Sequence, residues 1–124
     1  MTIWKKKLKT IVNNKENVKE YFKDFKREIP LKLYYIKFTF RNIKDEGLCY
    51  GPYIERKTGK KYILIVINQK NSFNIQLNAL MHEYAHCLYL DRGFNYTTAE
   101  NAHGVEWGKC YSEVYRVFLK INKP

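Results

Sequence analysis

The stretch LMHEYAHCLYL, residues 80–90, forms the centre of a predicted helix that begins near Ile75, with Asn74 as its N-cap, and ends near Asp91. Its apolar side chains recur at helical spacing: Ile75, Leu77, Leu80, Met81, Tyr84, Ala85 and Leu88. Together they would cover a broad face of the helix. A face of that width is typical of a helix inside a protein, so we expect this one to be buried.

Two histidines and a glutamate interrupt the apolar stretch. His82 and His86 are four residues apart, so on a helix they lie above one another on the same face and can bind one zinc ion. Glu83 lies about 100° around the helix, where it can reach a water molecule on that ion. It could take the proton of this water and pass it to a leaving amine. The spacing predicts a zinc site that hydrolyses peptide bonds, whereas the plain alternative is three polar residues on the exposed edge of a helix.

A zinc site needs a third protein ligand, which this helix does not supply. A metzincin would have glycine at position 89 and histidine at position 92, but this chain has Tyr89 and Arg92, so that class is excluded. A thermolysin-like site would use a downstream glutamate, for which Glu100 and Glu106 are candidates. The third candidate is His103, the only other histidine of the chain.

His103 opens a second motif, HGVEW, at residues 103–107. With HEYAH at residues 82–86, this motif resembles the SprT-like zinc metallopeptidases, which include the Spartan proteases. The resemblance implies that Zn²⁺ is held by three histidines: His82, His86 and His103. It also implies that Glu83 is the catalytic acid and base, and that Glu106 is a motif position rather than a ligand. No oxyanion-stabilising residue is identified, although Tyr96 and Tyr111 are near in sequence.

Changes in sequence period predict the other elements. Helices are expected at residues 3–12 and 15–28, the second ended by Pro30, and a last helix from Ala99 or Val105 to Ile121. Alternating or β-branched segments predict three strands: Tyr34–Arg41, Gly47–Arg56 with a bend at Gly51-Pro52, and Lys61–Ile67. The expected fold is α+β, with N-terminal helices, a mainly antiparallel three-stranded sheet, an active-site helix and a closing C-terminal helix. The resemblance to the SprT-like family implies that this fold is zincin-like.

The strand Lys61–Ile67 is apolar on both faces, which favours a buried position in the sheet. The strand Gly47–Arg56 could then be the edge strand. An edge strand can pair with the extended backbone of a protein substrate.

The three cysteines are Cys49, Cys87 and Cys110, an odd number without a CxxC pair. Neither a disulfide framework nor the cysteine zinc ribbon that many SprT-like proteins carry is therefore expected. No apolar segment has the length of a membrane span, and no secretory signal is seen. We expect one bare catalytic domain over residues 1–124, monomeric and in a reducing cytoplasm.

The formal net charge of +11 is unevenly distributed. Residues 1–70 hold 18 Lys and Arg against seven Asp and Glu, whereas residues 71–124 hold five of each kind. A basic half suggests an anionic partner, nucleic acid first, although a solvated lysine-rich surface would have the same composition. The candidate contacts form two clusters of basic residues: Lys5, Lys6, Lys7, Lys9, Arg56, Lys57, Lys60 and Lys61. Tyr50, Tyr53 and Tyr62 could stack on unpaired bases beside the second cluster.

These patterns lead to a principal hypothesis and two alternatives. Because Spartan-type proteases act on proteins attached to DNA, the resemblance implies a metallopeptidase whose partners are a protein substrate and single-stranded or crosslinked DNA. The first alternative is a zinc-containing, non-catalytic module that binds nucleic acid or protein. The second is a cytoplasmic metallopeptidase with a glutamate as third ligand, which cleaves a regulator.

Overall fold

The structure is a computed structural model that describes residues 14–95 and 103–122. Helix α2 comes first and is followed by three strands and two further helices: α2 (Asn14–Glu28), β1 (Tyr35–Arg41), β2 (Gly47–Ile54), β3 (Lys61–Asn68), α3 (Phe73–Asp91) and α5 (Val105–Ile121). This order confirms the predicted α+β class. The helix predicted at residues 3–12 lies outside the described residues.

The sheet has the strand order β1-β3-β2, so β3 is central and β2 is an edge strand, as its sequence predicted. β2 runs antiparallel to β3, with a register shift between Tyr50 and Tyr53 at the predicted bend. β1 runs parallel to β3, and Tyr35 pairs with Tyr62. The prediction of a mainly antiparallel sheet is therefore wrong. β3 takes the central place because both of its faces are apolar and need to be covered. The chain reverses direction between β1 and β2 and again between β2 and β3, so β1 runs in the same direction as β3.

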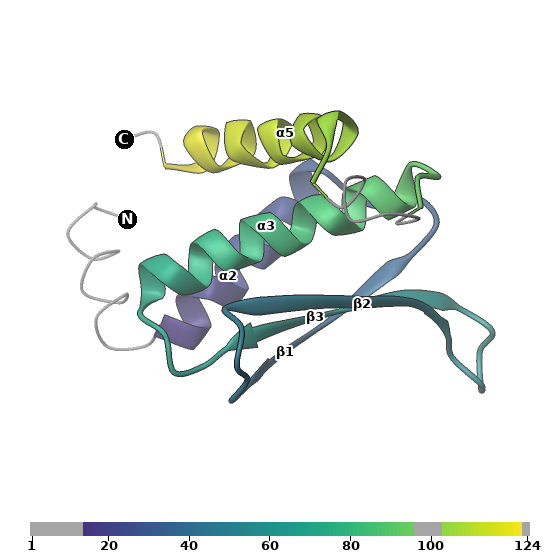
Figure 1. Ribbon diagram of the computed structural model, residues 1–124, viewed down its shortest axis with the longest axis horizontal. Helices are drawn as coiled ribbons and strands as arrows, with labels where there is room; N and C mark the ends of the chain where they lie inside the picture. The colour runs from purple at the N-terminus through teal and green to yellow at the C-terminus, as the bar shows by residue number, and fades with distance from the viewer. Residues whose placement is uncertain (1–13, 96–102, 123–124) are drawn as a thin grey trace.

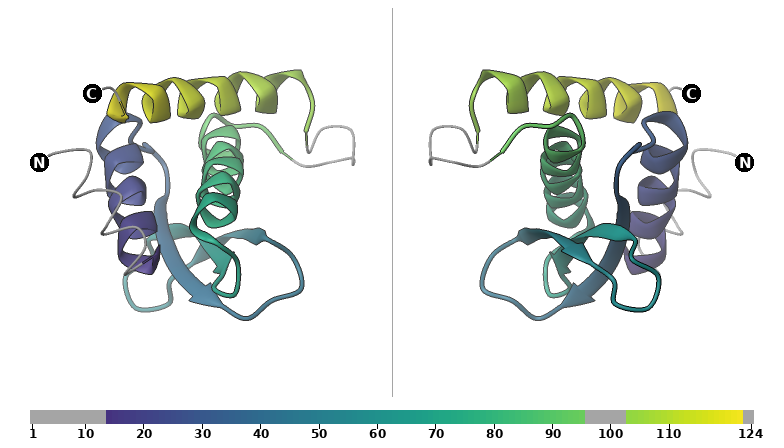
Figure 2. Two further views of the ribbon diagram at one scale, coloured as in Figure 1. Left: turned by 90° about the vertical axis from the view of Figure 1, so that its left-hand side faces the viewer. Right: turned by 90° about the vertical axis from the view of Figure 1, so that its right-hand side faces the viewer.

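Helix α3 lies between the sheet and α5, beside α2 (Figure 1). Figure 2 shows α5 crossing above both α2 and α3, on the side away from the sheet. One face of β3 packs against α3 through fully buried Ile63, Ile65 and Ile67. Tyr84 of α3 is also fully buried, and its hydroxyl donates to the carbonyl of Ile29, at the end of α2, at 2.5 Å. The predicted buried helix is thus the centre of the core.

Helix α3 begins at Phe73, two residues before the predicted start. Ser72 is its N-cap, and no side chain caps the first turn, so the prediction of Asn74 as N-cap is wrong. Ser72 has an extended backbone and Phe73 is the first helical residue, so Asn74 lies inside the first turn of α3. At that position its side chain cannot act as the N-cap. The last helix begins at Val105, one of its two predicted starts.

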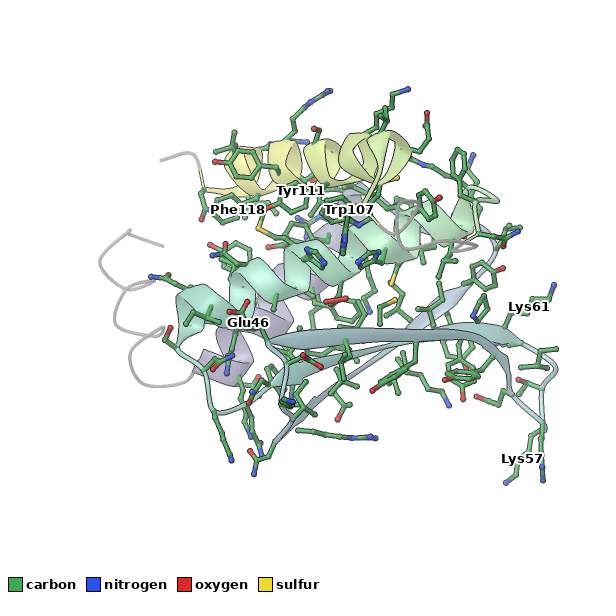
Figure 3. The ribbon with its side chains drawn as sticks, viewed as in Figure 1. Glu46, Lys57, Lys61, Trp107, Tyr111 and Phe118 are labelled. Atoms are coloured by element: carbon green, nitrogen blue, oxygen red, sulfur yellow. The ribbon has the colours of Figure 1, made fainter. Side chains whose placement is uncertain are left out.

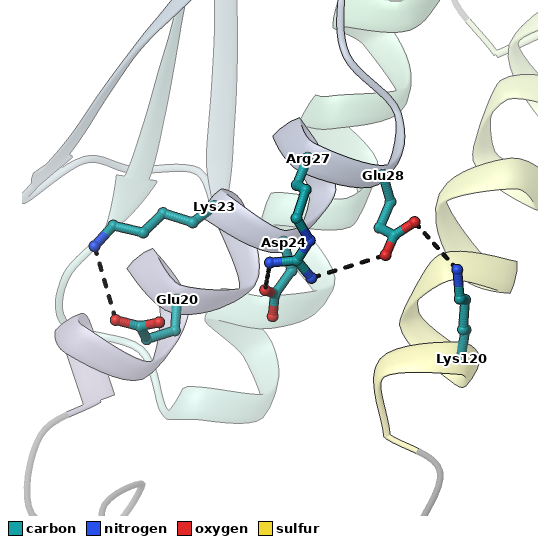
Figure 4. A network of polar contacts seen from close by, with 6 residues as sticks. All are labelled: Glu20, Lys23, Asp24, Arg27, Glu28 and Lys120. Carbon is teal, nitrogen blue, oxygen red and sulfur yellow. Dashed lines mark hydrogen bonds and ion pairs between the residues drawn. The ribbon is translucent and has the colours of Figure 1, made fainter.

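Ion pairs line the solvent side of α2 and reach α5 (Figure 4). Lys120 of α5 lies 3.2 Å from Glu28 of α2, whereas Lys23 and Arg27 pair with acids on α2 itself. Exposed pairs of this kind each contribute less than about 1 kcal/mol. The packing of α5 therefore depends mainly on its apolar stripe, in which Cys110 and Val114 are buried. In the described part of the chain, no helix has both the length and the apolar character of a membrane span.

Candidate metal site

Helix α3 brings two of the predicted zinc ligands together. The Nε2 atoms of His82 and His86 are 3.1 Å apart, as the four-residue spacing predicts for one helical face. Burial of this part of α3 lowers the pKa of His82, and lowers that of His86 to about 3. Both imidazoles are therefore neutral at pH 7, which is the form that binds metal ions.

The third histidine comes from the segment just before α5. The Nε2 of His103 lies 3.1 Å from the Nε2 of His82, although 21 residues separate them in sequence. One ligand atom from each of the three histidines lies within 4.8 Å of the others. Within the described ranges, no other group of three or more His, Cys, Asp or Glu residues could hold a metal ion.

Two of the three nitrogen separations are close to those of a tetrahedral metal site. With metal–nitrogen bonds of about 2.0–2.1 Å, two ligand nitrogens in a tetrahedron are about 3.3–3.4 Å apart, and His82 lies 3.1 Å from both His86 and His103. Three protein ligands also leave a fourth position for a non-protein ligand, as in catalytic zinc sites. Imidazole suits copper, iron and nickel as well as zinc, so the donor set indicates a transition metal rather than one particular ion.

Glu83 lies beside the histidines and is only 6% exposed. Burial raises the pKa of its carboxyl to about 7, and the negative charge of Asp45 adds to the effect. Among the described residues, no hydrogen bond or ion pair joins its carboxylate to another side chain or to the backbone. A buried carboxylate without such partners is costly unless it serves a site.

Two adjoining cavities meet at this place, of about 540 Å³ and 430 Å³. Both are lined by Gly47, His82 and Glu83. The larger one continues between α3 and α5 toward Trp107 and Tyr111, and the smaller one follows β2. The candidate site therefore lies in an open cleft, with room for a ligand on either side of Glu83.

Trp107 covers the histidines from the side of α5. Its ring centroid is 4.9 Å from those of His82 and His103, and 5.4 Å from that of His86. Figure 3 shows Trp107 and Tyr111 pointing from α5 toward α3, with Glu46 at the start of β2. The indole nitrogen of Trp107 is buried and has no hydrogen-bond partner among the described residues. From the sequence, Trp107 was expected as the aromatic position of HGVEW and as part of the apolar stripe of the last helix, but not as a cover over the histidines.

The alternative glutamate ligands are not part of the described group. Glu106 forms an ion pair with Lys109 at 3.2 Å, on the same helix, and Glu100 lies outside the described residues. Tyr111 lines the larger cavity, which keeps it near the cleft, whereas Tyr96 is outside the described ranges. Gly47 was not singled out from the sequence, because nothing in its neighbourhood marks it as part of a cleft.

The predicted nucleic-acid contacts that the structure describes lie away from this cleft. Arg56, Lys57, Lys60 and Lys61 belong to the hairpin tip between β2 and β3, and Figure 3 shows Lys57 and Lys61 at the opposite end of the sheet from Glu46. The other basic cluster lies outside the described residues: Lys5, Lys6, Lys7 and Lys9. The structure therefore separates the hairpin cluster from the histidines.

The chain matches no protein-family model, no curated protein and no solved structure. The resemblance to the SprT-like metallopeptidases therefore rests on the two motifs. The three-histidine group that the fold assembles from those motifs is consistent with a zincin-like site.

Proposed function

We propose that this protein is a zinc-dependent metallopeptidase of the SprT-like type. The observation that supports this proposal best is the meeting of three histidine nitrogens with a buried glutamate, unpaired among the described residues, in an open cleft. A structural zinc site is usually closed by four protein ligands and needs no adjacent carboxylate. Three ligands beside a carboxylate favour hydrolysis over a purely structural role.

His82, His86 and His103 would hold the ion. When bound there, zinc would supply a Lewis acid that polarises a carbonyl group. Glu83 would accept a proton from the attacking water and donate it to the leaving amine, because it lines both cavities that meet at the histidines. Trp107 would shield the histidine rings from solvent on the side of α5.

Strand β2 would hold the substrate. Its first half, through Gly47, Leu48 and Cys49, lines the cleft, and only β3 pairs with it among the described strands. Its other edge can therefore accept backbone hydrogen bonds from an extended peptide, which gives affinity with little sequence preference. This arrangement suits unfolded segments of proteins as the substrate class.

Glu83→Gln is the decisive experiment, because it keeps the shape of the side chain and removes its ability to accept a proton. We expect the variant to bind zinc as the wild type does and to lose cleavage of casein by at least about a hundredfold. Zinc content is measured by atomic emission, and cleavage by gel electrophoresis.

Glu106→Gln is the matched control, because this glutamate lies on α5, pairs with Lys109 and is outside the three-histidine group. It should retain full activity. If the wild type with zinc bound does not cleave casein or other unfolded proteins, or if Glu83→Gln cleaves them equally well, the peptidase proposal is wrong.

A second candidate function is binding of single-stranded nucleic acid, which would bring the peptidase to proteins on DNA. It is favoured by a row of tyrosines across the sheet, where the ring of Tyr62 lies 5.6 Å from Tyr35 and 5.5 Å from Tyr53. Lys37 lies over the Tyr62 ring at 4.2 Å, and the basic hairpin tip adjoins this row. Aromatic rings beside cations form the usual platform for unpaired bases.

This second candidate predicts that binding of single-stranded DNA weakens steeply between about 50 and 200 mM salt. Neutralising the hairpin tip with Arg56→Gln, Lys57→Gln, Lys60→Gln and Lys61→Gln should reduce the salt dependence as well as the affinity. Fluorescence anisotropy of a labelled oligonucleotide measures both quantities. Binding that does not respond to salt, or that is absent at the lowest salt concentration, would remove the idea.

A further inference from the structure

Gly47, the first residue of β2, passes unusually close to helix α3. A Cβ atom placed on Gly47 would lie 3.2 Å from the Cβ of Ala79 and 3.3 Å from both Cγ and Oε2 of Glu83. Nonbonded carbon atoms attract best at about 3.5–4.0 Å, so contacts at these shorter separations would be repulsive. The strand can approach the helix this closely because Gly47 has no side chain.

The backbone of Gly47 does not itself require glycine. The described glycines with positive φ are Gly51, Gly59 and Gly93, and Gly47 is not among them. Any amino acid could therefore adopt its backbone conformation. What a larger residue would lack at this position is space beside Glu83.

Contact with Gly47 limits where the Glu83 carboxylate can lie. Glu83 is 6% exposed, and among the described residues no hydrogen bond or ion pair orients its carboxylate. Gly47 stands on one side of it, and Ala79 precedes it by one helical turn. The Cβ of Ala79 is fixed to the helix backbone, whereas the side chain of Glu83 can rotate. A methyl group added at Gly47 would therefore move the carboxylate.

We propose that Gly47 is a positioning residue: the absence of a side chain at this point of β2 leaves the space that holds the Glu83 carboxylate in the cleft beside the histidines. The inference rests on the proposed function only in giving Glu83 a role in proton transfer. The contact between Gly47 and Glu83 is present whether or not the protein is an enzyme.

The kinetic test is Gly47→Ala in the zinc-loaded protein. Contacts of 3.2–3.3 Å require the carboxylate to move by a few tenths of an ångström. Because a displacement of about 1 Å can cost about a hundredfold in rate, we expect kcat to fall about 3- to 10-fold, with KM changed less than about twofold. The affinity for zinc should stay within about twofold, since the three atoms nearest to the added methyl group belong to Ala79 and Glu83 and not to a histidine. Gly108→Ala is the control, because a Cβ at that position meets no atom within 4 Å. An unchanged kcat in Gly47→Ala, or an equal loss in Gly108→Ala, would overturn the inference.

A double-mutant cycle tests the contact itself, without zinc and without activity. In the metal-free protein, Gly47→Ala should lower the melting temperature by about 3–6 °C when Glu83 is present. The same change should cost clearly less in the Glu83→Ala background, because Cγ and Oε2 are then absent. Should Gly47→Ala alone fail to fold, the inference still predicts that Gly47→Ala/Glu83→Ala folds.

Additive changes in the melting temperature would show that the two residues do not share this space, and would overturn the inference. The cycle also separates the two proposals. A wild type without peptidase activity contradicts the proposed function, whereas the coupling between Gly47 and Glu83 is decided by the melting temperatures alone.

Discussion

Helices α3 and α5 both contribute to the candidate site, yet they are held in the molecule in different ways. Of the 19 residues of α3, 13 are buried, including Glu83 and His86, whereas α5 buries only Cys110 and Val114. His82 and His86 therefore keep their geometry as long as the core is folded. His103 keeps its place only while α5 stays packed on α3. The pair of histidines on α3 is thus held by the hydrophobic core, whereas His103 is held by the packing of α5 on α3.

The largest expected effect is on zinc affinity, and it should differ between the pair of histidines on α3 and His103. The free energy of zinc binding is about 10 kcal/mol or more and is shared among the ligands. Removal of one histidine should therefore weaken zinc binding about a hundredfold to a thousandfold. His82→Ala should lie at the upper end, because its Nε2 is within 3.1 Å of both other histidines. His103→Ala should lose less, since it leaves the pair on α3 intact. Competition with a chromophoric chelator measures both values.

Melting temperatures of the metal-free variants are the control for this ranking. If His103→Ala binds zinc as the wild type does, while Glu106→Ala or Glu100→Ala does not, the third ligand is a glutamate. That result would contradict the assignment of His103 as the ligand that depends on the packing of α5.

The second prediction concerns global stability. Leu80 of α3 is fully buried, and Leu80→Ala should cost about 3 kcal/mol of unfolding free energy through the cavity that it leaves. Val114 of α5 is equally buried but smaller, so Val114→Ala should cost about 2 kcal/mol. Urea denaturation measures both.

The two core variants should also differ at the metal site. Val114→Ala should weaken zinc binding more than Leu80→Ala at temperatures where both proteins are folded, because it loosens the helix that follows His103. Equal zinc affinities in the two variants would mean that α5 is as firmly fixed as α3.

The third prediction concerns the pH dependence of stability that the buried carboxyl group of Glu83 on α3 should cause. The pKa of Glu83 rises from 4.5 to about 7 in the folded protein, so the native state holds a proton that the unfolded chain has lost. The stability from this group is complete below pH 4.5 and is lost as the pH rises through 7. In EDTA above pH 7, Glu83→Gln should therefore be more stable than the wild type by about 2–3 kcal/mol. Urea titrations from pH 4.5 to 8 test this.

His86 has the opposite dependence, because its pKa is lowered to about 3 and its contribution is lost as the pH falls below 6.5. This contribution is common to the wild type and Glu83→Gln, so the difference between them isolates the carboxyl group. A difference that does not change with pH would show that Glu83 is not buried in the way described.

The smallest expected effect is at the surface contact between the two helices. Arg92, which follows α3, is paired with Glu113 of α5, and both side chains are partly exposed. Glu113→Gln should cost less than about 1 kcal/mol, and the cost should shrink in high salt because exposed pairs are screened. Thermal melts at low and high salt measure it. A cost well above that of Val114→Ala would mean that charge, not the apolar stripe, docks α5.

Local pattern in the sequence predicted most elements, because hydrophobic period and helix breakers act over a few residues. Helix α2, the three strands and the helix around HEYAH all lie where they were expected to within about two residues. The pairing of β1 with β3 could not be predicted in the same way. Period shows which face of a strand is buried, but it does not show which strand lies beside it.

In the candidate site, too, local sequence pattern predicted some features, whereas contacts between distant segments could not be predicted. His82 and His86 follow from their spacing on one helix, and His103 was chosen over Glu100 and Glu106 because HGVEW resembles the second motif of the SprT-like metallopeptidases. The position of Trp107 against the three rings and the passage of Gly47 beside Glu83 depend on how α5 and β2 pack against α3. Such contacts join residues far apart in sequence and leave no local pattern.

The position of β1 also has a consequence for the order of folding. β2 and β3 are joined by a short turn and can pair as a hairpin, whereas the first parallel pair, Tyr35 with Tyr62, closes a loop of 27 residues. Loop closure of that length costs chain entropy that a local hairpin avoids. We therefore expect the hairpin to form early and β1 to join later. Because His103 precedes α5, the three histidines would come together only after the last helix has docked.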